Sequence, residues 1–417
     1  RIEVLMAAMQ KAGLPFKPPL PLPDKPSIAV LAFDNLSGDP EQEYFSDGIA
    51  ENIITALSKV GELFVIARNS SFTYKGKPAR IQQVGRELGV RYVLEGSVQK
   101  SGDRVRITAQ LIDAKNGQHL WAENYDRDLH DIFEIQDEIT KKIVTSMRLN
   151  LTEGEQARLF GKQTKNLDVY LKLAQLLSLS RVGTKESIMR YGQIAQEIID
   201  IEPDNPVGYR HMGWYHRHLA GFRISPRENL GKALMWGKKA LAMDESDGFA
   251  HALLGYIYYQ MRKYEKAIES GKRSVELQPN GAMVHVLYGN TLNSASRVDE
   301  AIAYIRKAIR LNPFPAFYYY QYLGSAYAQK GQYEKALTEF RKAHQQAPKS
   351  PWPHVFLATT YTLLGRDEEA RASTGKCLEL MPNMSVSLIS KTWAINNQDH
   401  RELVLEAMRK AGFPEGA

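Results

Sequence analysis

Cysteine is nearly absent from this sequence, and long apolar runs are absent altogether. Cys377 is the single cysteine among 417 residues, so an intrachain disulfide and a zinc site built on several cysteines are both excluded. No stretch approaches the roughly 20 consecutive apolar residues of a membrane-spanning helix, and the first residues lack the apolar core of a signal peptide. We therefore expect a soluble chain without a membrane segment, located in the cytoplasm unless a membrane helix precedes Arg1.

Basic tracts and catalytic motifs are equally scarce. The chain has 54 Lys and Arg residues against 47 Asp and Glu residues, and no dense basic run is present. Nucleic-acid binding by this chain itself is therefore not expected. We also find no grouping of nucleophile and base, no set of metal ligands and no glycine-rich nucleotide loop. The sequence thus predicts no catalytic residue, no metal and no cofactor.

A repeat with a period of about 34 residues fills the second half. Four copies share a small residue, an alanine twelve positions later and a proline twelve positions after that. The copies are Gly255, Ala267 and Pro279; Gly289, Ala301 and Pro313; Gly324, Ala336 and Pro348; and Ala358, Ala370 and Pro382. Self-similarity at this period is typical of an array of helical hairpins.

The four copies resemble tetratricopeptide (TPR) repeats, most clearly in the segments KYEKAIESGKRSVELQP, RVDEAIAYIRKAIRLNP and QYEKALTEFRKAHQQAP. The small residues let the two helices of a hairpin approach closely, and the proline ends the hairpin because it cannot continue a helix. Two weaker copies with insertions precede these four. We expect about six hairpins over residues 165–382, beginning near Leu167, and capping helices over residues 383–417, one of them near Arg401–Ala411.

The first half carries apolar runs of strand length separated by helical patterns. Ile28–Phe33 and Leu63–Ala67 are continuous apolar runs, as expected of strands covered on both faces. Apolar residues recur on one helical face after each run. These residues are Ile49, Ile53, Leu57 and Val60 for the first helix, and Ile81, Val84 and Leu88 for a shorter second helix.

The apolar period then changes to two, with turn signals on either side. This alternation predicts an antiparallel meander of strands near Arg91–Lys100, Arg104–Asp113 and Gln118–Tyr125. A helix should close the domain, with one apolar face formed by Ile132, Ile135, Ile139, Ile143 and Met147. Residues 1–26 are predicted to form a short helix, at Arg1–Gly13, and a proline-rich linker. The fold class expected is an α/β domain with a mixed sheet followed by an all-α TPR superhelix.

A second resemblance covers residues 27–151. Its clearest segments are SIAVLAFDNLSGDPEQEYFSDGIAENIITALSKV, LFVIARNSSFTYKGK, GVRYVLEGSVQKSGDRVRITAQLIDAKNGQHLWAENYDRDLHDIF and IQDEIT. These segments resemble the TolB amino-terminal-like domain. Joined directly to TPR repeats, such a domain is similar to the C-terminal regulatory region of bacterial class III adenylate or guanylate cyclases.

The resemblance implies a non-catalytic regulatory and protein-interaction region of a bacterial signalling protein in a cyclic nucleotide pathway. Because the sequence begins at Arg1 rather than at a methionine, we expect the catalytic domain of such a parent to lie upstream. Cyclases of this class work as dimers, so the resemblance also implies a homodimer. The alternatives are the regulatory region of a winged-helix transcriptional regulator and an extracytoplasmic TolB-like assembly factor.

Two small motifs in the first half are candidate sites. The turn Ser37-Gly38-Asp39-Pro40 lies between a predicted strand and a predicted helix, where a helix N-terminus could bind phosphate. It has one glycine and no P-loop lysine, which favours a structural turn. Asp47 and Glu51 lie one helical turn apart, and a solvated role or a favourable interaction with the helix dipole is preferred over catalysis.

Histidines recur in the second half at positions that could suggest metal binding. His251, His285 and His354 occupy the same position in three repeats. Equivalent positions in the array lie too far apart to share one ion, so packing between helices is the preferred interpretation. The three histidines of RHMGWYHRHLAGFR lie closer together but lack carboxylate support, and no metal is predicted there either.

The inner helices of a TPR superhelix line a concave groove, and the resemblance places eleven residues there. Amides can pair with main-chain groups, aromatic rings supply contact area and arginines can hold carboxylates, which suits an extended peptide or a partner helix. The alternative is that these residues are merely exposed or pack against the N-terminal domain. The residues are Arg210, Trp214, Arg217, His218, Tyr256, Tyr259, Gln260, Asn290, Asn293, Tyr318 and Gln321.

Overall fold

The computed structural model describes residues 19–149, 151, 152, 155, 156, 159, 164–182, 184–393 and 396–416. The helix predicted at Arg1–Gly13 lies outside the described residues. The chain divides into two compact units. Unit 1 comprises Arg1–Ile194 with Leu311–Pro313, and unit 2 comprises Ala195–Arg310 with Phe314–Ala417.

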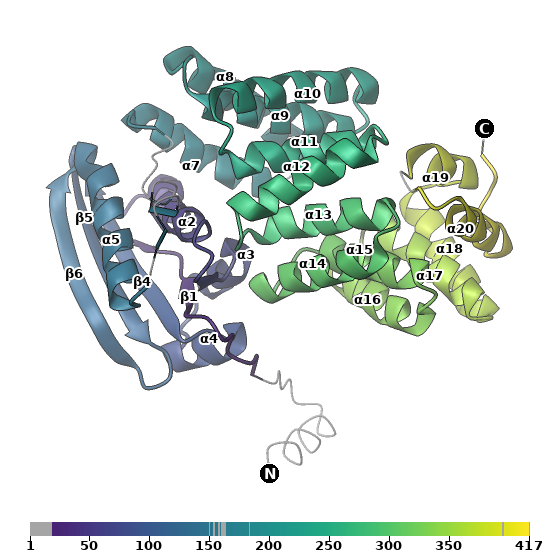
Figure 1. The fold of residues 1–417 in the computed structure, drawn as a ribbon, viewed down its shortest axis with the longest axis horizontal. Coiled ribbons are helices and arrows are strands. Elements are labelled where there is room, and N and C mark those ends of the chain that lie inside the picture. The colour runs from purple at the N-terminus through teal and green to yellow at the C-terminus, as the bar shows by residue number, and fades with distance from the viewer. Residues whose placement is uncertain are drawn as a thin grey trace, which may run out of the picture. The chain divides into compact units, whose positions relative to one another are not determined.

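Unit 1 is built on a mixed sheet, which confirms the first half of the predicted fold class (Figure 1). Its described strands are β1 (Ser27–Val30), β2 (Asp34–Asn35), β3 (Phe64–Val65), β4 (Tyr92–Ser101), β5 (Arg104–Asp113) and β6 (Gln118–Asp128). The helices are α2 (Glu43–Leu57), α3 (Arg68–Ser71), α4 (Ile81–Leu88), α5 (Ile132–Ser146) and α7 (Leu167–Val182), with 3-10 turns at Pro40–Gln42, Phe72–Tyr74 and Leu129–Asp131.

The strand order is β3-β1-β4-β5-β6, and β2 pairs with β4. Strand β1 pairs in parallel with β3 and β4, and β2 pairs in parallel with β4. Strands β4, β5 and β6 form the antiparallel meander expected from the period-two segment. In β5, Val105, Ile107, Ala109 and Leu111 are fully buried while the residues between them are more exposed. The alternation arises because one face of this strand packs on the core and the other faces solvent.

The core lies between the sheet and helices α2 and α5. Each fully buried isoleucine or leucine contributes about 1.5–3 kcal/mol of transfer free energy. The predicted closing helix is confirmed as α5, and all five residues of its expected apolar face belong to the core: Ile132, Ile135, Ile139, Ile143 and Met147.

Several predicted bounds in unit 1 differ from those observed. The run Leu63–Ala67 yields only the two-residue strand β3, because Ala67 already stands at the N-cap of α3. Strand β2 and helix α3 were not predicted. The described end of the proline-rich segment is held to the domain rather than free, since the N–H of Leu20 donates to the carbonyl of Arg86 at 3.0 Å.

The first helix of the repeat array, α7, packs on α2 within unit 1. A Cβ atom added at Gly48 of α2 would lie 2.8 Å from the Cβ of Ala174, so this glycine permits the close approach. Phe45 of α2 and Tyr170 of α7 meet edge to face, with ring centroids 6.2 Å apart. The contact explains why α7 belongs to the same compact unit as the sheet.

Unit 2 is a succession of antiparallel helices, which confirms the TPR superhelix of the predicted fold class (Figure 1). The chain runs from α8 (Lys185–Ile201) through α9 (Pro206–Gly221), α10 (Pro226–Met243), α11 (Gly248–Gln260), α12 (Tyr264–Leu277), α13 (Ala282–Ser294), α14 (Val298–Leu311), α15 (Phe317–Gln329), α16 (Tyr333–Gln346), α17 (Pro351–Leu363) and α18 (Asp367–Leu380) to α19 (Val386–Thr392) and α20 (Gln398–Lys410). The part of α8 up to Ile194 and the last residue of α14, Leu311, belong to unit 1.

Small residues set the helix-to-helix distance in these pairs, as the repeat pattern predicts. A Cβ at Gly289 of α13 would lie 2.6 Å from Ile305 Cγ1 and 3.1 Å from the carbonyl oxygen of Ala301, both on α14. A Cβ at Gly324 of α15 would lie 2.6 Å from the ring of Phe340 on α16. The glycines recur at the repeat period because each pair needs one close crossing.

The C-terminal segment returns along unit 2 after the last repeat pair. Helix α20, which corresponds to the helix expected near Arg401–Ala411, packs on α17. The backbone N–H of Asn396, just before α20, donates to the carbonyl of Ser294 at the end of α13 at 2.8 Å. The C-terminal segment therefore contacts both the last repeat pair and a helix in the middle of the array.

Candidate functional site

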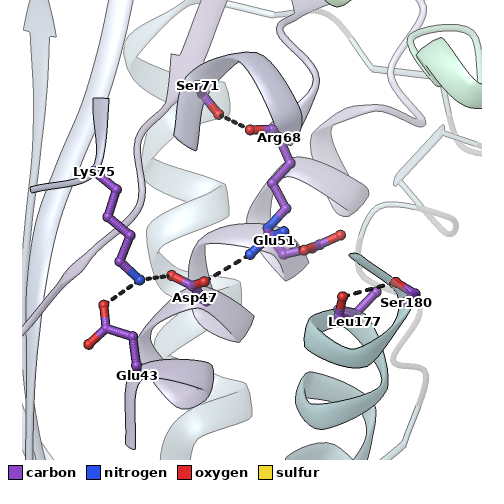
Figure 2. Close-up of polar contacts among 8 residues, drawn as sticks. All are labelled: Glu43, Asp47, Glu51, Arg68, Ser71, Lys75, Leu177 and Ser180. Carbon is purple, nitrogen blue, oxygen red and sulfur yellow. Dashed lines mark hydrogen bonds and ion pairs between the residues drawn. The ribbon is translucent and has the colours of Figure 1, made fainter. Parts of the chain in front are cut away.

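In unit 1, three acidic residues form a row along α2. Glu43, Asp47 and Glu51 share one face of α2 because they are spaced by four. The Nη2 atom of Arg68 lies 2.9 Å from Asp47 Oδ2, and its Nε atom lies 2.5 Å from Glu51 Oε2. Lys75 forms ion pairs with Asp47 and Glu43, so the two basic residues hold the row between them (Figure 2).

The solvated role expected as one possibility for Asp47 and Glu51 is wrong. Their side chains are only 16% and 19% exposed, and both are ion-paired. Burial raises the pKa of Glu51 to about 7, with Asp47 adding to the rise while Arg68 opposes it. The sequence could not predict these ion pairs, because Arg68 lies on the short helix α3, which has no periodic pattern in the sequence. The arrangement serves to attach α3 and Lys75 to α2.

The turn at residues 37–40 is structural, as expected. Its polar groups are used within the chain: Ser37 Oγ accepts the N–H of Lys100 at 2.9 Å, and Asp39 Oδ1 accepts the N–H of Glu41 at 2.9 Å. The Asn35 side chain accepts the N–H of Ser37 at 3.0 Å. These bonds fix the passage from β2 into α2.

In unit 2, Arg210 is held by an internal partner. Its Nη1 atom lies 2.7 Å from Asp247 Oδ2, and both residues are less than 10% exposed. The other oxygen of Asp247 accepts the N–H groups of Phe249 and Ala250 and so caps α11. This pair joins the start of α9 to the start of α11.

Six aromatic and basic side chains from three inner helices gather further along α9. Figure 1 shows these helices, α9, α11 and α15, within the array. The guanidinium Cζ of Arg217 lies 4.3 Å from the ring centroid of Tyr256 and 5.9 Å from that of Trp214. The group is called the tyrosine–arginine cluster and consists of Trp214, Arg217, Tyr256, Tyr259, Tyr318 and Tyr322.

Neighbouring amides and hydroxyls extend this cluster along α11 and onto α13. Gln260 Nε2 donates to the Tyr256 hydroxyl at 3.1 Å, and Tyr259 is hydrogen-bonded to Asn290 and Ser294. Burial raises the pKa of Tyr259 to about 12. Burial, with Arg217 adding to the effect, lowers the pKa of His218 to about 3, so this imidazole is neutral.

The structure thus brings most of the predicted groove residues together, but none of the eleven is fully exposed. Asn290 and Asn293 are 6% and 4% exposed. In the part of the chain that is described, Asn293 Oδ1, Gln321 Oε1 and Arg217 Nε have no hydrogen-bond partner. Sequence reasoning missed Tyr322, although its position four residues after Tyr318 places it on the same face of α15.

The histidines of unit 2 lie in different surroundings. His285 and His354 are buried, which confirms packing for these two, whereas His251 is only half-buried. Each histidine of α9 has its own neighbour; His216 Nδ1, for example, lies 2.7 Å from Asn229 Oδ1. Over the described residues, no three His, Cys, Asp or Glu side chains are grouped as metal ligands. None of the described helices combines the length and apolarity needed to cross a membrane.

Family models match three stretches of the chain. Residues 24–142 match the second domain of HilA/YgeH-like transcriptional regulators, so the matching model for the sheet domain is HilA-like rather than TolB-like. Residues 327–374 match a tetratricopeptide repeat model. Residues 227–308 match subunit 3 of the anaphase-promoting complex, or cyclosome.

One curated relative, "Putative adenylate cyclase 3" from Rhizobium meliloti (strain 1021), is 43% identical over 258 residues. The match covers 61% of this chain and 44% of the relative, so the chain spans less than half of that protein.

Solved structures match this chain at lower sequence identity. YrrB, a TPR protein with an unusual peptide-binding site, is 20% identical, with 47% of this chain and 97% of that chain covered and a TM-score of 0.34. The APC/C hetero-tetramer Cut9-Hcn1 is 16% identical, with 68% and 50% covered and a TM-score of 0.44. The helical half of this chain thus has the tetratricopeptide-repeat fold, and part of it matches a tetratricopeptide repeat model.

Proposed function

We propose that this chain is the non-catalytic regulatory region of a bacterial signalling protein, in which the TPR region binds a protein or peptide partner. The carrying observation is the tyrosine–arginine cluster on the inner helices, together with the amides beside it. Aromatic and arginine side chains are enriched at protein interfaces, and amides can pair with a peptide main chain. Binding would act by shifting a conformational equilibrium rather than by chemistry.

The parent protein that we propose is a class III adenylate or guanylate cyclase, with its catalytic domain outside this chain. The 43% identity to a relative that carries the adenylate cyclase name supports this parent. Such a region would work in the cytoplasm, where ATP and GTP are available, and as a homodimer if the cyclase domains pair. The α/β domain would then relay partner binding to the catalytic domain.

The second candidate is the regulatory region of a transcriptional regulator. It is favoured by the match of residues 24–142 to the second domain of HilA/YgeH-like regulators. In that case a DNA-binding domain would precede the chain, and the TPR region would bind the partner that controls it.

The deciding experiment uses the full-length gene product. Formation of cyclic AMP or cyclic GMP from ATP or GTP is measured with the intact protein and with residues 25–417 removed. Cyclase activity that changes on removal supports the first proposal. An inactive protein that binds promoter DNA in a gel-shift assay supports the second, and an active cyclase that is indifferent to the deletion contradicts a regulatory role.

A further inference from the structure

The tyrosine–arginine cluster contains a positive charge that the described chain does not neutralise. Burial opposes the charge of Arg217, whereas the phenols Tyr256, Tyr318 and Tyr322 favour it; Tyr256 is hydrogen-bonded to the guanidinium, and the Nδ1 atom of the neutral His218 lies 3.4 Å from its Nη1 atom. Among the described residues no carboxylate pairs with Arg217, and its Nε atom has no hydrogen-bond partner. A charge taken out of water without a counter-charge costs free energy.

Arg210 shows how the same helix accommodates an arginine that serves the fold. It lies two turns earlier on α9 and pairs with Asp247 at 2.7 Å. That carboxylate is itself fixed, because it also caps α11. Arg217 has no comparable arrangement within the described residues, which makes it a candidate to bind an anion of a partner.

The surroundings of Arg217 indicate what kind of anion fits. Burial raises the pKa of both Tyr318 and Tyr322, so their hydroxyls stay protonated and can donate hydrogen bonds. His218 beside it is neutral. One cation among neutral donors matches a single negative charge, whereas a phosphate group carries nearly two and calls for further cations. A carboxylate is therefore the better ligand.

Two buried amide oxygens near the cluster require donors. Asn293 Oδ1 and Gln321 Oε1 have no partner in the described chain, and Asn293 is only 4% exposed. They belong to α13 and α15, the helices that carry the hydrogen-bond partners of Tyr259 and the phenols Tyr318 and Tyr322. An extended peptide presents main-chain N–H groups that can donate to such oxygens.

We propose that the tyrosine–arginine cluster binds an Asp or Glu side chain in an extended segment of a partner protein, with the carboxylate at Arg217 and main-chain N–H groups at Asn293 and Gln321. This inference rests on the proposed function of the TPR region. The cluster draws its residues from α9, α11 and α15, so it lies within the array rather than at its end. At such a position a side-chain carboxylate lets the bound segment continue past the cluster in both directions, which a chain terminus does not.

The test begins with the full chain immobilised and two libraries of random 12-residue peptides. One library is displayed between two carrier domains, so that no peptide terminus is available, and the other carries a free C-terminus. We expect the internal library to yield binders with Asp or Glu at one shared position. If only free C-termini are selected, the side-chain proposal is overturned.

Selected peptides are then synthesised with a fluorescent label and titrated against variants. Arg217→Leu should weaken binding about 10- to 100-fold, the range expected for loss of hydrogen bonds to a charged group. Arg227→Leu, on the exposed side of α10, removes the same charge and should leave binding unchanged. Replacing the shared Asp or Glu of the peptide by Asn or Gln should weaken binding as much as Arg217→Leu does. Combining the peptide change with Arg217→Leu should weaken binding little more than either change alone.

The melting temperature separates a binding role from a structural one. Because Arg217 lacks a counter-charge in the described chain, Arg217→Leu should not lower it. If Arg217→Leu does lower the melting temperature, peptide binding by Arg217→Lys and Arg217→Gln is compared. Binding that only the Lys variant retains supports the proposal, and equal binding by the two variants overturns it. An absence of any selected peptide contradicts the proposed function itself, whereas binders without acidic residues contradict only this inference.

Discussion

Arg210 and Asp247 are joined at 2.7 Å, and the same carboxylate that neutralises Arg210 also caps α11. One residue thus links two successive inner helices of unit 2. Asp247→Asn keeps an oxygen for the cap but removes the charge, and we expect it to cost about 3–5 kcal/mol of unfolding free energy. Asp247→Ala should cost about 1 kcal/mol more, because the cap is lost as well. Urea denaturation measures both.

The control for this prediction is the double variant Arg210→Met with Asp247→Asn, which removes both charges. It should recover most of the stability lost by Asp247→Asn alone, since replacing both members of a buried pair is often neutral. If the losses of unfolding free energy from the two substitutions simply add, Arg210 and Asp247 do not stabilise each other.

Gly289 provides a test of the close helix crossing. Gly289→Ala would place a Cβ 2.6 Å from Ile305 and 3.1 Å from a backbone oxygen of α14, so we expect about 1–3 kcal/mol of destabilisation. Gly375→Ala on α18 meets nothing within 4 Å and should stabilise by about 0.5–1 kcal/mol through helix propensity alone. Thermal unfolding measures the stability of both variants. Equal changes in stability would contradict the packing explanation.

Glu51 should make unit 1 less stable as the pH rises. Its pKa is about 7 in the folded chain because of burial, against an ordinary value of 4.5. Between these values the unfolded chain releases the proton while the folded chain retains it, so stability is fully present below pH 4.5 and falls as the pH rises to 7. The difference amounts to roughly 3 kcal/mol at most.

Glu51→Gln should remove this dependence, and the measurement is the urea midpoint of wild type and variant at pH 5 and pH 7. The exposed Glu62→Gln is the matched control and should leave the difference between the two pH values unchanged. If the urea midpoint of Glu51→Gln changes with pH as much as that of wild type, burial does not raise the pKa of Glu51.

His285 should have the opposite effect in unit 2. Burial lowers its pKa to about 4 from an ordinary value of 6.5, so the folded chain resists protonation. Its contribution to stability is present above pH 6.5 and is lost as the pH falls towards 4, by roughly 3 kcal/mol at most. His285→Gln should lose less stability than wild type between pH 7 and pH 5. His251→Gln, at the same position of the preceding repeat but only half-buried, should behave like wild type.

Periodicity predicted much of the fold because it reports burial directly. The period-two segment located β4, β5 and β6, and the 34-residue repeat indicated the helix pairs. Strand β2 and helix α3 were missed because two to four residues are too short to carry a period. Their formation depends on contacts with β4 and α2, which lie elsewhere in the sequence.

The site was predictable to a lesser extent, for a related reason. Register placed Arg217 and Tyr256 on inner helices, and the structure brings them into contact. Register could not separate Arg210, which has an acidic partner, from Arg217, which has none among the described residues. That distinction depends on Asp247, a cap residue whose second contact arises only once α9 and α11 are packed.

The bond between Asn396 and Ser294 also bears on how unit 2 folds and unfolds. A repeat array with contacts only between neighbours behaves as a one-dimensional chain, in which either end can fray while the middle persists. Here the segment before α20 is tied to α13, 102 residues earlier, while α20 itself packs on α17. This closes a loop and raises the contact order of the array. Loss of the C-terminal helix would therefore loosen α13, so that the last repeats and the middle of the array unfold as one cooperative segment.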